Sequence, residues 1–178
     1  MIPRPYDHQV ASTAFKVQNP RVLDGSDPGT GKSRTVLDAF SQLKAAGEAS
    51  WMLVIAPLSI LRPSWEADAR TFTPHLTVSV VTAKTKFKSL PPETMADIYV
   101  VNHDAVKWLA NWKPPQGGVL VIDEVPAFKH RTSQRSKAIA GLRKHFDRRW
   151  MLSGTFNSNG VLDVWHPAFL CDDGERLG

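Results

Sequence analysis

The sequence is poor in cysteine, in export signals and in long apolar runs. Its single cysteine, Cys171, excludes an internal disulfide and a cysteine-rich zinc site, and it fits a reducing compartment. Residues 1–6 contain no apolar signal-peptide core. The longest apolar run, residues 51–58, is far too short to cross a bilayer. We therefore expect no membrane partner and a cytoplasmic location.

Internal repeats and low-complexity segments are also missing, and the composition is ordinary apart from its charge. The 178 residues, 42% hydrophobic and 22% charged, suit one globular domain over residues 1–178. The net charge is +5, and eight of the 22 lysines and arginines fall in residues 129–149, where Asp147 is the only acid. This basic stretch permits contact with nucleic acid, although the solvated face of a helix explains it equally well.

Apolar runs of strand length alternate with helical patterns along the chain. The expected strands are residues 21–24, 51–56, 76–81, 98–101, 119–122 and 149–152. The expected helices are residues 6–17, 33–46, 58–72, 104–112, 133–146 and 160–170. Pro63 must lie in or before the first turn of the helix 58–72, because proline interrupts a helix interior. The alternation predicts an α/β fold with a mostly parallel central sheet flanked by helices.

A glycine-rich loop follows the first expected strand. Residues 26–33 read Ser-Asp-Pro-Gly-Thr-Gly-Lys-Ser, which is a phosphate-binding pattern with Ser26 in place of its first glycine. Backbone N–H groups of such a loop surround a phosphate, and the next helix points its N-terminus at the same charge. The alternative is a surface turn ahead of a helix, which the preceding strand disfavours.

The loop predicts an ATP site in which each residue type has a task. Lysine reaches the β and γ phosphates, and the serine hydroxyl binds Mg²⁺. The small residues let the backbone approach the phosphates. The residues assigned to ATP are Gly29, Thr30, Gly31, Lys32 and Ser33, and Ser33 is also assigned to the metal.

An acidic pair ends the expected strand 119–122, about 90 residues after the glycine-rich loop. Asp123 is predicted to bind Mg²⁺, usually through water, and Glu124 to accept a proton from the attacking water. An acidic strand end in a loop is the alternative. The position of the pair downstream of a phosphate loop favours an ATPase site, with Lys32, Asp123 and Glu124 as its catalytic residues.

These motifs, in this order, resemble the first motor lobe of helicase superfamily 2, specifically the Swi/Snf-type DNA translocases in the compact form of phages and bacteria. The resemblance covers nearly the whole chain. It implies a RecA-like P-loop domain of three layers that binds ATP and Mg²⁺ and acts on DNA. It also implies a location inside a bacterium or a phage-infected host cell.

Two early segments carry the resemblance. Residues 6–9, Tyr-Asp-His-Gln, resemble the family's opening glutamine motif, which implies that Gln9 reads the adenine edge of ATP. Residues 56–61 and Trp65-Glu66 resemble the Pro-Leu-Ser-x-Leu…Trp-x-x-Glu segment, with one extra residue before the tryptophan. This match implies contact with the DNA backbone at Ser59 and Arg62, and a place in the core for Trp65.

Three later segments continue the match. Residues 100–104 resemble the stretch after the next strand, which implies a DNA contact at Asn102, although a turn-forming asparagine explains it equally well. Residues 123–130 resemble Asp-Glu-Ala-His-x-x-Lys-Asn, with Val-Pro in place of Ala-His, which implies a DNA contact at Lys129. Residues 152–159 resemble Leu-Thr-Gly-Thr-Pro-x-x-Asn, with Phe156 in place of the proline. This match implies that Ser153 and Thr155 relay between the acidic pair and DNA.

In the Swi/Snf-type family a second motor lobe follows, with an arginine finger that completes the ATP site. The 178 residues leave no room for that lobe, so we expect the chain alone to bind ATP weakly and to hydrolyse it slowly or not at all. A separate second lobe or a partner protein would then complete it. The alternative is a truncated, non-catalytic module that binds nucleic acid or a partner protein.

Overall fold

The computed structural model describes residues 2–155 and 162–176, and the side chains of residues 162 and 163 are not described. Within these ranges the chain forms six strands that pair in parallel, in the order β1-β6-β5-β2-β4-β3. The strands are β1 (Arg21–Asp24), β2 (Trp51–Ala56), β3 (Val78–Val80), β4 (Ile98–Asn102), β5 (Gly118–Ile122) and β6 (Arg148–Leu152). The predicted α/β fold is confirmed, and the described sheet is parallel throughout.

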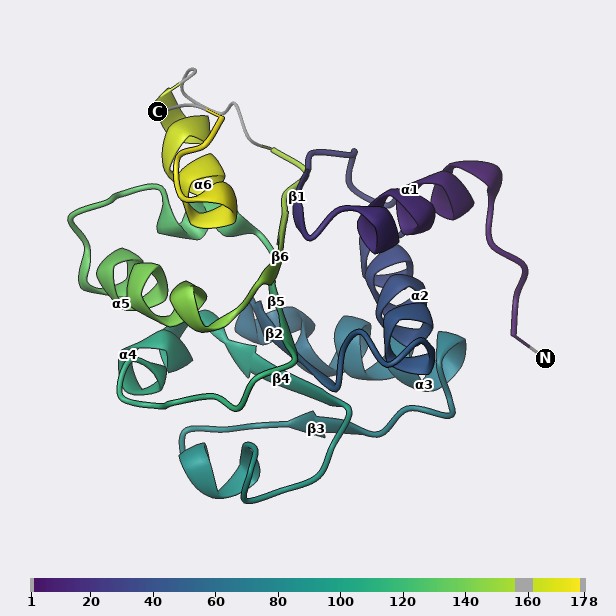
Figure 1. Ribbon diagram of the computed structural model, residues 1–178, viewed down its shortest axis with the longest axis horizontal. Coiled ribbons are helices and arrows are strands. Elements are labelled where there is room, and N and C mark those ends of the chain that lie inside the picture. The colour runs from purple at the N-terminus through teal and green to yellow at the C-terminus, as the bar shows by residue number, and fades with distance from the viewer. Residues whose placement is uncertain (1, 156–161, 177–178) are drawn as a thin grey trace.

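Helices cover both faces of the sheet. Figure 1 shows α1, α2 and α3 on one side and α4, α5 and α6 on the other. The helices are α1 (Asp7–Gln18), α2 (Lys32–Ala45), α3 (Ala67–Phe72), α4 (Val106–Leu109), α5 (Gln134–Leu142) and α6 (Leu162–Asp172). The three layers follow from the apolar strands, because a parallel sheet must bury both of its faces. Among the described residues no helix is long and apolar enough to cross a membrane.

The core lies in two clusters, one on each face of the sheet. Successive side chains of a strand point to opposite faces, and β2 is buried along its whole length. Trp51 faces the cluster under α4, α5 and α6, where it packs edge-on against Tyr99, Trp112 and Phe146. A side chain at Gly118 would come within 2.5 Å of the Trp51 ring, so this close approach of β5 requires glycine.

The expected helix 58–72 is divided into three parts. A 3₁₀ turn spans Leu58–Ile60, a π-helical turn spans Leu61–Glu66, and α3 follows. Pro63 lies inside the π-helical turn and has no N–H to donate, so regular α-helical bonding fails there. A π-helical turn accommodates an extra residue, and the sequence has one extra residue before Trp65.

Other element ends also differ from the sequence-based expectation. The expected helices 104–112 and 133–146 are shorter, because 3₁₀ turns form at His103–Ala105 and Arg143–His145. The expected strand 76–81 reduces to Val78–Val80 at the sheet edge. Residues 156–159 of the motif at 152–159, including Phe156, lie outside the described residues.

Candidate nucleotide and magnesium site

The loop between β1 and α2 has the backbone geometry of an anion cradle. Gly29 and Gly31 have φ angles of +79° and +82°, in the left-handed region that favours glycine. Gly31 caps the N-terminus of α2, and the first turn of that helix contains no acid. The unpaired N–H groups at the start of α2 and the positive end of its dipole therefore lie at this loop. We refer to residues 25–31 as the glycine loop.

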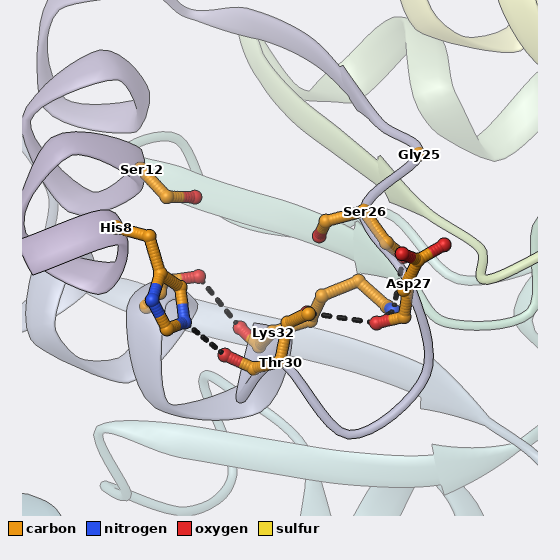
Figure 2. A pocket seen from close by; sticks show the side chains of 8 residues that line it. His8, Ser12, Gly25, Ser26, Asp27, Thr30 and Lys32 are labelled. Carbon is orange, nitrogen blue, oxygen red and sulfur yellow. Dashed lines mark hydrogen bonds between the residues drawn. The ribbon is translucent and has the colours of Figure 1, made fainter. Parts of the chain in front are cut away.

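Lys32 already points into the glycine loop. Its Nζ atom donates hydrogen bonds to the carbonyl oxygens of Ser26, at 2.7 Å, and Asp27, at 2.9 Å. Figure 2 shows the Lys32 side chain extending toward Ser26 and Asp27. A bound phosphate would offer this ammonium stronger, charged acceptors. Lys32 is thus held against the glycine loop by two backbone carbonyl groups.

A cleft of about 410 Å³ opens between the glycine loop and α1. Its lining residues are His8, Ser12, Gly25, Ser26, Asp27, Thr30, Lys32 and Thr35 (Figure 2). His8 Nε2 donates to the carbonyl oxygen of Thr30 at 3.2 Å, and its ring stacks on Tyr6 with 5.7 Å between centroids. The cleft is therefore bordered by the glycine loop and by the His8 ring of α1.

Gln9 lies against the glycine loop. Its Nε2 atom donates to the carbonyl oxygen of Thr30 at 3.1 Å, and its Oε1 atom accepts the backbone N–H of Tyr6 at 3.1 Å. A side chain at Gly31 would overlap the Gln9 amide. Only 6% of Gln9 is exposed. Gln9 is thus placed beside the candidate ATP site, with both ends of its amide hydrogen-bonded inside the chain.

A buried ion pair anchors the start of the glycine loop, and the sequence reading missed it. Lys16 Nζ on α1 lies 2.5 Å from Asp24 Oδ2 at the end of β1, and the two side chains are 1% and 8% exposed. Asp24 Oδ1 accepts the N–H and the hydroxyl of Ser26, at 3.1 and 2.5 Å. Ser26, which departs from the usual glycine, therefore ties the loop to this pair.

Opposing effects act on the ionisation of Asp24. Burial favours its neutral form, but the Lys16 ammonium and the hydrogen bonds from Lys16 and Ser26 outweigh burial and hold the pKa of Asp24 below its usual value. Asp24 is therefore a carboxylate at neutral pH. Lys16, Asp24 and Ser26 thus form a charged hydrogen-bond network that joins α1, β1 and the glycine loop.

Asp123 lies at the carboxyl end of β5 and is held by its neighbours. Trp65 Nε1 donates to Asp123 Oδ2 at 2.9 Å, and the backbone N–H of Glu124 donates to Oδ1 at 3.0 Å. Burial raises the pKa of Asp123, and these two hydrogen bonds and the charge of Lys32 limit the rise. His103 Nε2 donates to the carbonyl oxygen of Asp123 at 2.8 Å, a contact that no motif indicated.

Glu124 has a strained backbone and a hydroxyl partner. Its φ of +50° lies in the left-handed region, which is uncommon for a residue with a side chain and occurs often at functional sites. Ser153 Oγ donates to Glu124 Oε2 at 3.4 Å and accepts the N–H of Thr155 at 2.9 Å. A side chain at Gly154 would come within 2.7 Å of the Pro28 ring. The predicted relay residues therefore lie between the acidic pair and the glycine loop.

Ser33 contacts an acid that the sequence reading did not assign. Its hydroxyl donates to Asp68 Oδ2 on α3 at 2.5 Å. The sequence reading paired Trp65 with Glu66, yet Glu66 forms ion pairs with Arg62 and Arg70, at 2.8 and 2.7 Å, instead. Residues three apart share one face of a helix, so the spacing from Trp65 to Asp68 was the available signal.

The oxygen ligands suit Mg²⁺ better than a metal that prefers nitrogen and sulfur. Among the residues that the structure describes, no three His, Cys, Asp or Glu side chains gather as a metal cluster. Mg²⁺ usually binds one or two protein oxygens and completes its shell with water and phosphate. The Ser33 hydroxyl and the Asp123 carboxylate fit that need. Lys32 lies near enough to influence the pKa of Asp123.

The candidate DNA contacts follow strands whose ends share one sheet edge. Ser59 and Arg62 come after β2, Asn102 ends β4, and Lys129 follows the 3₁₀ turn after β5. Ser59 is exposed, and Arg62 is exposed while paired with Glu66. Carboxyl ends of parallel strands meet at one edge, where ligands of α/β sheets bind. The four residues therefore lie at the edge that carries Asp123.

The parallel three-layer fold, with a glycine loop after one strand and an acidic pair after another, is that of the RecA-like ATPase cores. The model of the SNF2-related domain matches residues 22–170, and the chain belongs to this family. A putative protein p41 of Acyrthosiphon pisum secondary endosymbiont phage 1 is 30% identical over 191 aligned positions, which cover 99% of the chain. A putative helicase 109L of Invertebrate iridescent virus 3 is 31% identical over 99 positions, which cover 54% of the chain.

Two solved structures have a similar fold. The Sulfolobus solfataricus SWI2/SNF2 ATPase core in complex with dsDNA has a TM-score of 0.83 and 25% identity, and the match covers 98% of the chain. The same organism's SWI2/SNF2 ATPase core domain has a TM-score of 0.75 and 25% identity, over 97% of the chain. The chain spans 40% and 28% of the two viral proteins, and 38% and 37% of the two solved chains.

Proposed function

We propose that the chain is the ATP- and Mg²⁺-binding first motor lobe of a SNF2-type DNA translocase. The observation that supports this proposal is that Ser33 and Asp123 bond to two side chains only three residues apart, Asp68 and Trp65, while Lys32 lies near enough to Asp123 to act on its charge. Residues 1–178 are proposed to form one domain, which a second lobe or a partner protein completes. Membership of the SNF2-related family supports the same conclusion.

In this proposal the glycine loop holds the phosphates, with Gly29, Thr30 and Gly31 around them. Lys32 neutralises charge on the β and γ phosphates. Ser33 and Asp123 hold Mg²⁺, which when bound offsets the charge that develops during phosphoryl transfer. Glu124 orients the attacking water and accepts its proton, and the Ser153 hydroxyl fixes the Glu124 carboxylate.

Gln9 is proposed to face the adenine of ATP, because it lies beside the loop at the cleft that α1 borders. Double-stranded DNA is proposed to lie at the edge of Ser59, Arg62, Asn102 and Lys129. The Sulfolobus core was solved with dsDNA, which supports a DNA partner for this fold. Thr155 is proposed to pass the state of the acidic pair toward that edge.

The first test is a thermal-shift measurement on the unaltered chain and on Lys32→Ala. ATP with Mg²⁺ is expected to raise Tm, because a ligand that binds only the folded state stabilises it. Lys32→Ala is expected to abolish the rise, since the loop then lacks its phosphate-binding ammonium. Lys137→Ala, which removes an exposed cation on α5, is the matched control and should keep it. An unaltered chain with no shift at millimolar ATP would contradict the proposal.

A second candidate function is a module that binds nucleic acid without using nucleotide. The observation that favours it is a cavity lined by cations of the basic stretch, residues 129–149. Several cations of the basic stretch have intrachain partners: Arg135 pairs with Asp104, Arg148 with Glu48, and Arg143 and Arg149 with Asp173. Other cations, including Arg131, Lys137 and Lys144, line a cavity of about 580 Å³ between α5 and α6. Such a basic cavity attracts phosphate backbones of any sequence.

Salt titrations separate the two candidates. The slope of log affinity against log salt concentration is negative, and each lost phosphate contact reduces its magnitude by about 1. If DNA lies at the carboxyl edge of the sheet, Arg62→Ala is expected to weaken binding of a duplex and reduce the magnitude of the slope, while Lys137→Ala leaves both unchanged. The reverse result would favour the basic cavity. The titration is read by fluorescence anisotropy with and without ATP.

A further inference from the structure

The two candidate Mg²⁺ ligands are joined by a single helical turn. Ser33 lies at the start of α2, and Asp123 follows β5. The two ligands therefore belong to different elements, and neither element by itself fixes the distance between them. Trp65 donates to the Asp123 carboxylate at 2.9 Å, and Asp68 accepts from the Ser33 hydroxyl at 2.5 Å. Trp65 and Asp68 are three residues apart, which places them on one face of the helix.

We propose that Trp65 and Asp68 are positioning residues that hold the two Mg²⁺ ligands as a pair. This inference rests on the proposed function, because it needs Mg²⁺ to bind between Ser33 and Asp123. Neither residue touches the metal in this proposal. Each acts on a ligand, and the shared helical turn sets one ligand relative to the other.

The contact with Asp68 determines which part of the Ser33 hydroxyl faces the metal. A serine hydroxyl has one proton to donate and two lone pairs. When the hydroxyl donates its hydrogen bond to the Asp68 carboxylate, both lone pairs of the Ser33 oxygen remain available for a cation. A charged acceptor also makes this hydrogen bond stronger than a neutral one would be. Asp68 thus presents Ser33 as a ligand before the metal arrives.

The contact with Trp65 fixes the Asp123 carboxylate. An indole N–H is a donor only, so it binds one oxygen and competes with no cation. The N–H of Glu124 binds the other oxygen. Each carboxylate oxygen then keeps a lone pair for Mg²⁺ or for its water. The orientation of the carboxylate is set while its charge remains.

The helical segment that carries both residues is anchored in the core. Trp65 is 1% exposed and lies in the core cluster on the α2 and α3 face of the sheet. The backbone N–H of Ala67 donates to the carbonyl oxygens of Arg62 and Ser64, which closes the π-helical turn. Ligand-orienting groups act through such fixed geometry, and their loss typically weakens metal binding 10- to 100-fold.

The test compares ATP affinity with and without Mg²⁺ for the full chain and its variants. Trp65→Phe removes the indole N–H but keeps an aromatic ring, and Asp68→Ala removes the acceptor for Ser33. Each variant is expected to lower the Mg²⁺-dependent gain in affinity about tenfold, while metal-free affinity stays unchanged. Asp68→Asn keeps an oxygen acceptor and should recover part of the gain.

Two matched controls lie outside the site. Trp112→Phe removes another buried indole N–H, which bonds the carbonyl oxygen of Pro91 at 3.2 Å, and Glu66→Gln removes the neighbouring acid. Both should keep the Mg²⁺-dependent gain. Equal losses with and without Mg²⁺, or unchanged binding in Trp65→Phe and Asp68→Ala, would overturn the inference alone. A chain in which ATP does not bind at all would overturn the proposed function and this inference together.

Discussion

Asp24→Asn is expected to lower the free energy of unfolding by about 3–5 kcal/mol, because it leaves the buried Lys16 ammonium without its counter-charge. Lys16 is 1% exposed and cannot regain water without opening the contact between α1 and β1. The asparagine also loses the charged acceptor for Ser26. Urea unfolding at neutral pH measures the change as a lower midpoint with an unchanged m value.

The matched control is an exposed ion pair. Glu66→Gln removes the partner of Arg62 and Arg70, whose side chains are largely exposed, and should lower stability by less than about 1 kcal/mol. A similarly small loss in Asp24→Asn would show that the buried pair contributes little to stability.

The same pair predicts a dependence of stability on pH. The folded-state pKa of Asp24 lies below the ordinary value of 3.8, so the unfolded chain takes up the proton first as the pH falls. The contribution of Asp24 to stability is therefore complete above pH 3.8 and is lost as the pH falls through the folded-state pKa. The Asp24→Asn variant should lack this acid-dependent loss.

ATP turnover by the chain alone is expected to be at least about 10³-fold slower than in a chimera where it replaces the matched segment of the phage p41 relative. Here the part of p41 outside the matched 40% of its length is taken as the second lobe. The family resemblance assigns an arginine finger to that lobe, and such a group raises the rate of phosphoryl transfer about 10³- to 10⁵-fold. DNA-stimulated phosphate release measures the difference. Lys32→Ala in the chimera is the control and should remove the gain.

A fast, DNA-stimulated rate from the unaltered chain alone, abolished by Lys32→Ala, would contradict this expectation. It would mean that the described lobe contains all the groups that the reaction needs. A slow chain with a fast chimera would instead support the division of labour between two lobes. Glu124→Gln in the chimera should keep ATP binding and lose turnover, because the Glu124 carboxylate is proposed to accept the proton of the attacking water.

The fold and the family were predictable from short segments of sequence. The alternation of apolar strands with helices predicted the parallel three-layer architecture, which is confirmed. The resemblance to the Swi/Snf-type lobe is confirmed by the SNF2-related domain match. The roles of Lys32, Ser33, Asp123 and Glu124 remain predictions. The motifs that contain these residues could be recognised because each is contiguous in the sequence. Recognising a contiguous motif requires no knowledge of how the chain folds.

The contacts between motifs were not readable from the sequence. The helical pattern of residues 58–72 did not predict the π-helical turn at Leu61–Glu66. That turn arises from Pro63 together with one extra residue before Trp65, and neither feature alone specifies it. The basic stretch, residues 129–149, permitted either contact with nucleic acid or the solvated face of a helix, yet folding pairs several of its cations with acids distant in the sequence. Local patterns do not carry such information, since they cannot specify which distant charge will lie nearby.

The sequence alone was enough to indicate an SNF2-type ATPase lobe and to name the loop and acids of its candidate site. Folding added the contacts of Lys16 with Asp24, of Trp65 with Asp123 and of Ser33 with Asp68, which join residues 8, 58 and 35 positions apart. The physical reason is geometric. A motif specifies which groups a reaction needs, but the distances between those groups depend on how the sheet brings separate strand ends and helix starts together.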